Sequence, residues 1–273
     1  MTSVEPGLSY AEYAARPGLR AGYLAAIDRS TPGGAEFKAR QGNDTASMRW
    51  GAALHCMVLE PERFAAEYTI GGPVNPKTSQ PYGSETKAFS EWALAQTKPI
   101  LTREEHRLIL GMADAIGAHP VARTIRDSPR QTEVSIFWDN DGVQCKARLD
   151  CLQTGVLWDI KSARSAKYRP FHHSIVEYGY ALQAAWYMRG AAAVGMPVQK
   201  FLWIAVENAA PYQIAVYRCS DTFWQFGHDR CDAALETYKQ CAAKGVWPTA
   251  YAQEEILMEP EKWLLPDEDS IEA

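Results

Sequence analysis

The segment from 131 to 162 constrains the fold more than any other, because strand-forming residues replace helical patterns there. From Glu133 it reads EVSIFWDNDGVQCKARLDCL, in which two runs of strand formers flank a turn-forming cluster at 139–142. A further run of strand formers, VLWDIKS, follows at 156–162. This arrangement predicts a β-hairpin and a third strand that lie in one sheet.

Helical patterns precede and follow these strands, with apolar residues recurring at three- and four-residue intervals. The expected helices cover 19–29, 46–68, 85–97, 102–118, 166–194 and 221–243, and further strands cover 201–207 and 212–218. The stretch 70–84 is rich in Gly, Pro, Ser and Asn, which predicts a long loop. The fold class is therefore α/β of the α+β kind, with a mixed central β-sheet flanked by helices and a helical N-terminal region.

The length of the chain suits one structural domain, since 273 residues can bury a single sizeable core. We expect a helical region over 1–130 that packs on a core over 131–250, followed by an acidic tail at 251–273.

Composition indicates an ordinary globular protein of the cytoplasm. Hydrophobic residues make up 47% and charged residues 22% of the chain, which leaves little room for extensive disorder. We expect no secretory signal and no membrane span, because the apolar stretches are too short. The six cysteines show no metal-binding spacing, so we expect reduced thiols. The net charge of −5 argues against a protein that coats nucleic acid, but not against an enzyme with a local basic channel.

Three ionisable residues on the predicted strands form a candidate centre. Asp159 and Lys161 are two residues apart, so their side chains project from the same face of a strand. Asp150 lies on the preceding strand, and the carbonyl of Ile160 is near the same edge. Carboxylate and carbonyl oxygens are ligands for Mg²⁺ or Mn²⁺, and Lys161 would orient or help deprotonate an attacking water. The pattern therefore predicts metal-dependent hydrolysis of a phosphodiester.

Simpler explanations exist for the same residues. An Asp-x-Lys pair on a strand is usually a solvated surface pair. Here the strand around Asp159 is hydrophobic, where a carboxylate without a partner or a metal is costly. For Asp150, Arg148 on the same face of the hairpin is an alternative partner as a structural counter-ion.

The chain resembles the PD-(D/E)xK nuclease superfamily, and in particular its RecE (exonuclease VIII) and lambda-exonuclease branch. The strand motifs that carry the resemblance are E-V-S-I-F-W, C-K-A-R-L-D and V-L-W-D-I-K-S. The motif G-A-A-L-H, whose last residue is His55, is similar to the G-x-x-x-H helix of RecB-like nucleases. The segment Q-A-A-W-Y, from Gln183 to Tyr187, is similar to their Q-x-x-x-Y helix. The resemblance covers residues 8 to 251 and implies a restriction-endonuclease-like core.

The resemblance also implies roles for single residues. It assigns metal binding to His55, Asp150, Asp159 and the carbonyl of Ile160. Lys161 would be the catalytic lysine, and Glu133 would support or bind the metal. Gln183 would hold the lysine or a phosphate of the DNA backbone, with Tyr187 packed beside it. Alternatively, His55 is a core residue and Glu133 an exposed strand end, and Glu133 is the weakest member of the set.

Two features depart from the family pattern. Leu149 stands where the family often has proline, a change that we expect to be harmless. Residues 17–24 match less well, which weakens what the resemblance implies for recognition of a DNA end.

Basic residues follow the proposed centre without an intervening acid. This run comprises Lys161, Arg164, Lys167, Arg169, His172 and His173. We expect contacts with DNA from Arg148, Arg164, Lys167, Arg169, His172 and Tyr187. The alternative for the run is a solvated helix face. A second candidate for phosphate contact is the set Arg123, Arg126 and Arg130.

The resemblance implies a double-strand DNA exonuclease that depends on Mg²⁺ or Mn²⁺ and acts in the 5′–3′ direction in phage or prophage recombination. Its expected partners are ends of double-stranded DNA, a single-strand annealing protein, and further copies of the chain in a ring-forming homo-oligomer. One alternative is a RecB-like endonuclease or repair nuclease, which the absence of a cysteine cluster disfavours. Another is a non-catalytic DNA-binding protein with the same fold, against which Asp150, Asp159 and Lys161 count.

Overall fold

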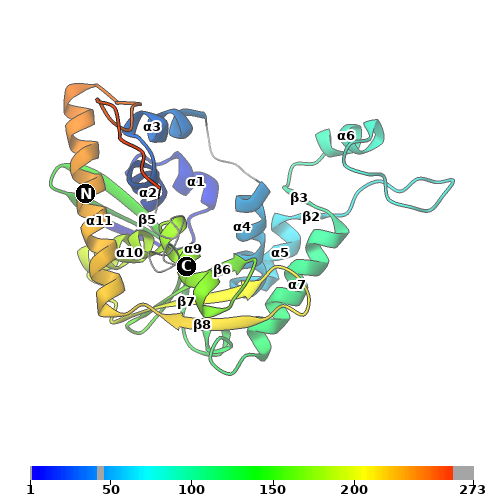
Figure 1. The fold of residues 1–273 in the computed structure, drawn as a ribbon. Coiled ribbons are helices and arrows are strands. Elements are labelled where there is room, and N and C mark those ends of the chain that lie inside the picture. Colours follow the sequence, from blue (N-terminus) through cyan, green and yellow to red (C-terminus); the bar gives the residue numbers. More distant parts are fainter. Residues whose placement is uncertain (1, 42–45, 261–273) are drawn as a thin grey trace, which may run out of the picture.

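A mixed six-stranded sheet lies at the centre of the computed structural model, which describes residues 2–41 and 46–260 (Figure 1). The strand order is β1-β4-β5-β6-β7-β8. The strands are β1 (Ser3–Glu5), β4 (Gln131–Asn140), β5 (Val143–Gln153), β6 (Val156–Ala163), β7 (Lys200–Glu207) and β8 (Ile214–Arg218). Helices flank this sheet, so the predicted fold class is confirmed.

The expected hairpin consists of β4 and β5, which pair antiparallel from Asn140↔Val143 to Gln131↔Leu152. β6 pairs antiparallel with β5 and parallel with β7, and β8 returns antiparallel to β7. A parallel pair requires a crossover connection, which α9 (Tyr168–Glu177) and α10 (Tyr180–Ala193) supply.

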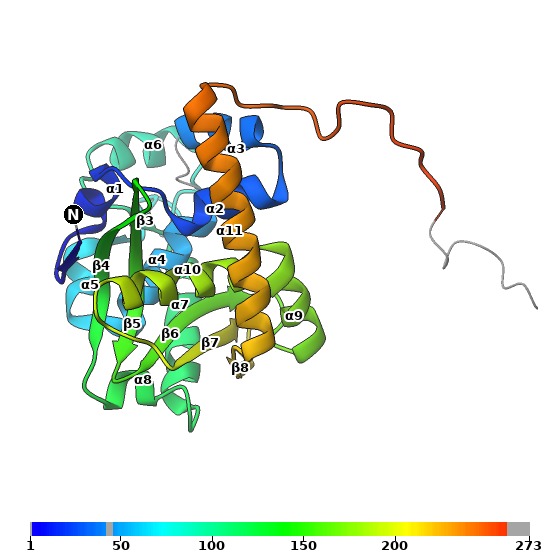
Figure 2. The same ribbon diagram turned by 90° about the vertical axis from the view of Figure 1, so that its left-hand side faces the viewer.

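One face of the sheet is covered by helices from both ends of the chain (Figure 2). α10 packs against β4 and β5, and α11 (Asp221–Lys244) and α2 (Ala21–Arg29) pack against α10. The buried core on this side includes Trp138, Trp186 and Trp203.

The opposite face is covered by α4 (Ala46–Leu59) and α7 (Arg103–Ala118). α4 packs against β5, β6 and α7, and α7 also contacts β7. Leu54, Ile109 and Ile160 belong to a second buried cluster on this side. The sheet therefore separates two cores, and α4 is held directly over β5 and β6.

The remaining elements are short. They are α1 (Tyr10–Ala15), α3 (Pro32–Gln41), α5 (Pro61–Glu67), α6 (Lys87–Leu94), α8 (Thr124–Asp127), β2 (Thr69–Ile70) and β3 (Ile100–Leu101). β2 and β3 pair in parallel at the base of an arm that carries α6 away from the sheet (Figure 1). The arm contains the predicted loop.

Several boundaries differ from the sequence predictions. The helix expected at 46–68 is divided at Glu60 into α4 and α5, because Pro61 cannot continue the backbone hydrogen bonds of α4. The strand β1 and the helix α3 were not predicted.

The N-terminal region is not a separate layer, since β1 joins the central sheet and α2 packs with α10 and α11. Residues 246–260 form neither helix nor strand, and 261–273, most of the expected acidic tail, lie outside the described residues. Within the described parts of the chain, no helix has the length and apolar character that crossing a membrane requires.

Because α11 packs closely on α10, adding one methyl group at Gly227 should destabilise the protein strongly. A Cβ atom there would lie 2.1 Å from the carbonyl oxygen of Ala181, so the two helices would have to separate. We expect Gly227→Ala to lower the free energy of unfolding by about 2 kcal/mol or more. Gly22, in α2, has nothing within 4 Å of its Cβ position and is the matched control. Gly22→Ala should raise stability by roughly 0.5–1 kcal/mol in the same urea titration, and equal effects of the two changes would contradict this packing.

Candidate metal centre

The centre lies where β5 and β6 separate. Their ladder comprises the pairs Gln153↔Val156, Leu152↔Leu157 and Cys151↔Trp158. Asp150 and Asp159 are the next residues along the two strands, and both are buried. The ladder ends before these two residues. Oδ2 of Asp150 instead accepts a hydrogen bond from the backbone N–H of Ile160 at 3.2 Å. A carboxylate thus replaces the neighbouring strand at the point of separation.

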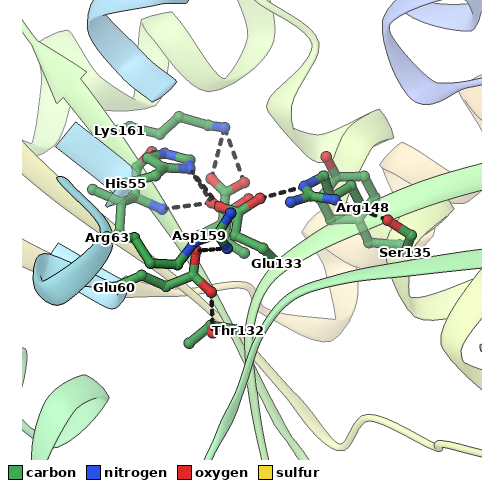
Figure 3. A network of polar contacts seen from close by, with 12 residues as sticks. His55, Glu60, Arg63, Thr132, Glu133, Ser135, Arg148, Asp159 and Lys161 are labelled. Atoms are coloured by element: carbon green, nitrogen blue, oxygen red, sulfur yellow. Dashed lines mark hydrogen bonds and ion pairs between the residues drawn. The ribbon is translucent and has the colours of Figure 1, made fainter. Parts of the chain in front are cut away.

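His55 reaches this point from α4 on the opposite side (Figure 3). Its Nε2 lies 3.0 Å from the carbonyl oxygen of Ile160. Its Nδ1 lies 3.5 Å from Oδ2 of Asp150 and 3.6 Å from Oε1 of Glu133. His55 therefore lies beside the strand residues with which the resemblance grouped it.

Glu133 lies on β4 between the pairs Thr132↔Cys151 and Val134↔Leu149. Its backbone adopts φ +51°, a conformation that is rare for a residue with a side chain. Its carboxylate is shared between His55 on one oxygen and Arg148 on the other, whose Nε donates at 2.5 Å. The residue that the sequence supported least is thus part of the cluster.

Arg148 lies inside the protein, with a side chain that is 12% exposed. It pairs with Glu133 rather than with Asp150, the carboxylate for which it was the alternative counter-ion. Its remaining hydrogen bonds go to the carbonyl of Leu8 at 2.7 Å and to Oγ of Ser135 at 3.0 Å. The structure therefore gives Arg148 internal partners, and its contact with DNA stays a prediction.

Lys161 lies on the α10 side of the sheet and is held by three groups. Its Nζ lies 2.9 and 2.8 Å from the two carboxylate oxygens of Asp159, and it donates to Oε1 of Gln183 at 2.9 Å. Nζ also lies 4.6 Å from the ring centre of Tyr180, which the sequence analysis missed. The amide of Gln183 donates in turn to the hydroxyl of Tyr187 at 2.9 Å. Gln183 therefore holds the lysine, while Tyr187 is half-buried behind it instead of facing DNA.

The charges of the cluster shift its pKa values. Burial raises the pKa of Asp150 to about 7, although the neighbouring His55 opposes the shift. Burial would lower the pKa of His55, but the carboxylates of Asp150 and Glu133 outweigh it and raise the pKa to about 9. Burial likewise disfavours the charge of Lys161, yet Asp159 raises its pKa above the ordinary value. At neutral pH both His55 and Lys161 thus carry a positive charge, as imidazolium and ammonium.

His55, Glu133 and Asp150 are suited to bind a divalent ion. One ligand atom from each lies within 4.8 Å of the others, and the three come from α4, β4 and β5. One imidazole nitrogen with carboxylate oxygens is a donor set for divalent metals. The carboxylate of Asp159, the fourth predicted ligand, is instead engaged by Lys161. Asp159 and the Ile160 carbonyl lie beside this group of three and remain predicted ligands.

The sequence analysis missed a neighbouring network of polar contacts (Figure 3). Glu60 accepts hydrogen bonds from Thr132 at 3.1 Å and from Arg63 at 2.8 Å, and Arg63 also bonds Glu67 at 2.7 Å. Glu60 ends the helix that carries His55, so the network links that helix to β4 beside Glu133. In the sequence, only the charged segment E-P-E-R at 60–63 could have indicated this network.

The predicted DNA contacts after β6 lie on the surface. Arg164, Lys167, Arg169, His172 and His173 are all exposed around the start of α9. The second basic set differs, because its members interact with the protein itself. Arg126 donates to the carbonyl of Val58 at 3.1 Å, Arg130 donates to the carbonyl of Arg126, and Arg123 lies 3.7 Å from Asp127. Arg123 has a side chain that is 61% exposed, whereas Arg126 and Arg130 are half-buried, and phosphate contact by this set stays a prediction.

Binding of a divalent ion at this centre should release protons. With a pKa of about 9, His55 is protonated in the metal-free protein at neutral pH, and a nitrogen ligand must lose its proton to bind a metal. The affinity for Mn²⁺ should therefore rise with pH up to that value, by as much as about tenfold per unit for each proton displaced. Calorimetric titrations in buffers with different ionisation enthalpies count the released protons. His55→Ala should reduce that number, whereas an affinity that does not change with pH would contradict the assignment of His55 as a ligand.

Comparisons with known proteins agree with this geometry. Among solved structures, the fold is similar to a crystal structure of a protein from Eubacterium rectale described as a "putative exonuclease". The two chains are 12% identical, with a TM-score of 0.63 over 92% of this chain and 93% of the other, so the likeness concerns the fold. No curated protein matches the sequence.

A sequence model of a family described as a PDDEXK-like domain of unknown function (DUF3799) matches residues 34–259. The matched range contains the hairpin, the Asp159-x-Lys161 strand and the helices of His55 and Gln183. The chain therefore belongs to this family of PDDEXK-like domains.

Proposed function

We propose that the protein is a metal-dependent deoxyribonuclease, and more specifically an exonuclease that degrades double-stranded DNA from its ends. The observation that carries the proposal is the joint position of His55, Glu133 and Asp150 beside the Asp159–Lys161 pair. The family and the name of the structural neighbour support nuclease chemistry. The 5′–3′ direction, the role in phage or prophage recombination, the annealing partner and the ring assembly follow from the sequence resemblance and belong to the same proposal.

When bound, Mg²⁺ or Mn²⁺ would supply Lewis acidity and stabilise negative charge on the phosphodiester oxygens. His55, Glu133 and Asp150 would hold the ion, with Asp159 and the Ile160 carbonyl alongside. Because Asp159 raises the pKa of Lys161, the lysine remains an ammonium at neutral pH. It therefore acts as a hydrogen-bond donor that orients the attacking water and stabilises charge, rather than as the base. Gln183 fixes the ammonium in this position.

Removal of the ammonium should abolish cleavage while the metal ligands remain. We expect Lys161→Met to lower the rate of DNA cleavage by at least about 100-fold, because a positioned charge at the reacting phosphate is lost. Lys200→Met, which changes an exposed lysine on β7, is the matched control and should leave the rate unchanged. The assay follows end-labelled linear duplex and closed circular DNA with Mg²⁺, Mn²⁺ or a chelator.

The outcomes of this assay separate the candidate functions. Loss of nucleotides from linear ends alone supports the exonuclease, and cutting of the circle favours a RecB-like endonuclease. If neither metal supports cleavage, a non-catalytic DNA-binding protein is the remaining candidate. Full activity of Lys161→Met would contradict the role of the lysine even if the protein is a nuclease.

The exposed basic residues at the start of α9 should contact the DNA backbone. We expect Arg164→Ala, Lys167→Ala and Arg169→Ala each to weaken duplex binding and to reduce the slope of log affinity against log salt by about 0.9. Lys87→Ala, on the distant α6, should change neither quantity. Binding measured by fluorescence anisotropy at several salt concentrations tests this, and slopes equal to that of the wild type would show that α9 lies outside the DNA path.

A further inference from the structure

The N-terminal segment, residues 3–20, wraps both edges of the β4–β5 hairpin. β1 pairs with β4 through Ser3↔Phe137, Val4↔Ile136 and Glu5↔Ser135. On the other edge, the backbone of Leu19 donates to Gln144 and accepts from Lys146, both at 2.8 Å. All of this segment precedes the residues that the family match covers.

Two long basic side chains of β5 attach this segment to the hairpin. Lys146 is buried, and its ammonium donates to the carbonyls of Tyr13, Ala14 and Arg16 around the end of α1. Arg148 donates to the carbonyl of Leu8. Lys146 has no acceptor at the metal centre among its bonds, whereas Arg148 also bonds Glu133. The second attachment therefore connects the segment to the centre.

Arg148 makes this connection with the fork of its guanidinium. It lies opposite Ser135 in the β4–β5 ladder, so its side chain follows the same face of the hairpin as Ser135. Nη1 donates to Leu8 and Ser135, and Nε is thereby directed at Oε2 of Glu133. The other oxygen of that carboxylate, Oε1, is the one that faces Nδ1 of His55.

Glu133 requires such support because of its backbone. A residue with a side chain at φ +51° costs conformational energy, and it persists only where the surroundings fix it. β1 ends its pairing at Ser135, and Gly7 then turns the chain at φ +78°, which brings the carbonyl of Leu8 to Arg148.

We infer that Arg148 is a positioning residue of the metal centre, and that the N-terminal segment fixes it through the carbonyl of Leu8. Arg148 does not bind the metal. It sets the orientation of the Glu133 carboxylate, so that Oε1 of that group faces His55. The inference rests on the metal centre of the proposed function. Partners that orient metal ligands commonly contribute about 10- to 100-fold to metal affinity.

The test measures the affinity for Mn²⁺ by calorimetry on the full-length protein without DNA. Arg148→Met should weaken Mn²⁺ binding by about tenfold or more. Arg148→Lys keeps the charge but lacks the planar guanidinium whose spaced donors reach Leu8, Ser135 and Glu133 together, so it should retain only part of the affinity. Arg189→Met is the matched control, because Arg189 is also largely buried and pairs with a carboxylate, Asp232, in α11. It should leave the affinity unchanged.

The role of the N-terminal segment is tested by straining its turn. Gly7→Val places a β-branched residue at φ +78°, where the added Cβ meets nothing within 4 Å, so the change strains the backbone of the turn without a clash at that atom. We expect it to weaken Mn²⁺ binding by roughly threefold or more. Gly245→Val imposes a similar strain at φ +65° after α11, again with nothing within 4 Å, and should leave the affinity unchanged.

Thermal unfolding of each metal-free variant verifies that it is folded under the titration conditions. Folded Arg148→Met with an affinity within about twofold of the wild type would overturn the inference. A wild-type protein that binds Mn²⁺ but cuts no DNA would refute the proposed function alone, because the affinity ratios still decide the role of Arg148. A wild-type protein that binds no Mn²⁺ would refute both.

Discussion

Three carboxylates lie close together in the interior of this protein, and the balance of their charge organises the structure around them. Burial of a carboxylate without a partner is costly, so Glu133, Asp150 and Asp159 each require a positive group. The cations that meet this requirement are Arg148, His55 and Lys161. They come from β5, α4 and β6, and the pairs of His55 with Glu133 and Asp150 connect α4 to the sheet. The proton of His55 and a divalent ion are alternative ways to neutralise Glu133 and Asp150.

The separation of β5 from β6 creates the place where these groups meet. Adjacent strands normally satisfy each other's backbone groups, but here the carboxylate of Asp150 bonds the N–H of Ile160 and the ring of His55 lies against its carbonyl. A metal site built from backbone and side chains at such an opening needs only small movements to exchange a proton for an ion.

The strand part of the site could be predicted from the sequence, because alternation along a strand places Asp159 and Lys161 on one face. The contact of His55 with Ile160 joins residues 105 positions apart, and no local pattern predicts it, so it followed from the resemblance alone. Glu133 was doubtful because its position depends on an unusual backbone conformation. β1 was not predicted because its three residues are too few to show the alternation of a strand. Arg148 was assigned to DNA because the sequence does not show that Leu8 and Ser135 occupy its donors.

The most direct test of the metal centre is the anomalous scattering of Mn²⁺ in crystals of the protein soaked with that ion. The structure predicts one strong peak about 2.0–2.3 Å from Nδ1 of His55 and from carboxylate oxygens of Asp150 and Glu133, with Nε2 of the ring still donating to the Ile160 carbonyl. A peak bound to other residues, or no peak at these three at an Mn²⁺ concentration that supports DNA cleavage, would contradict the assignment.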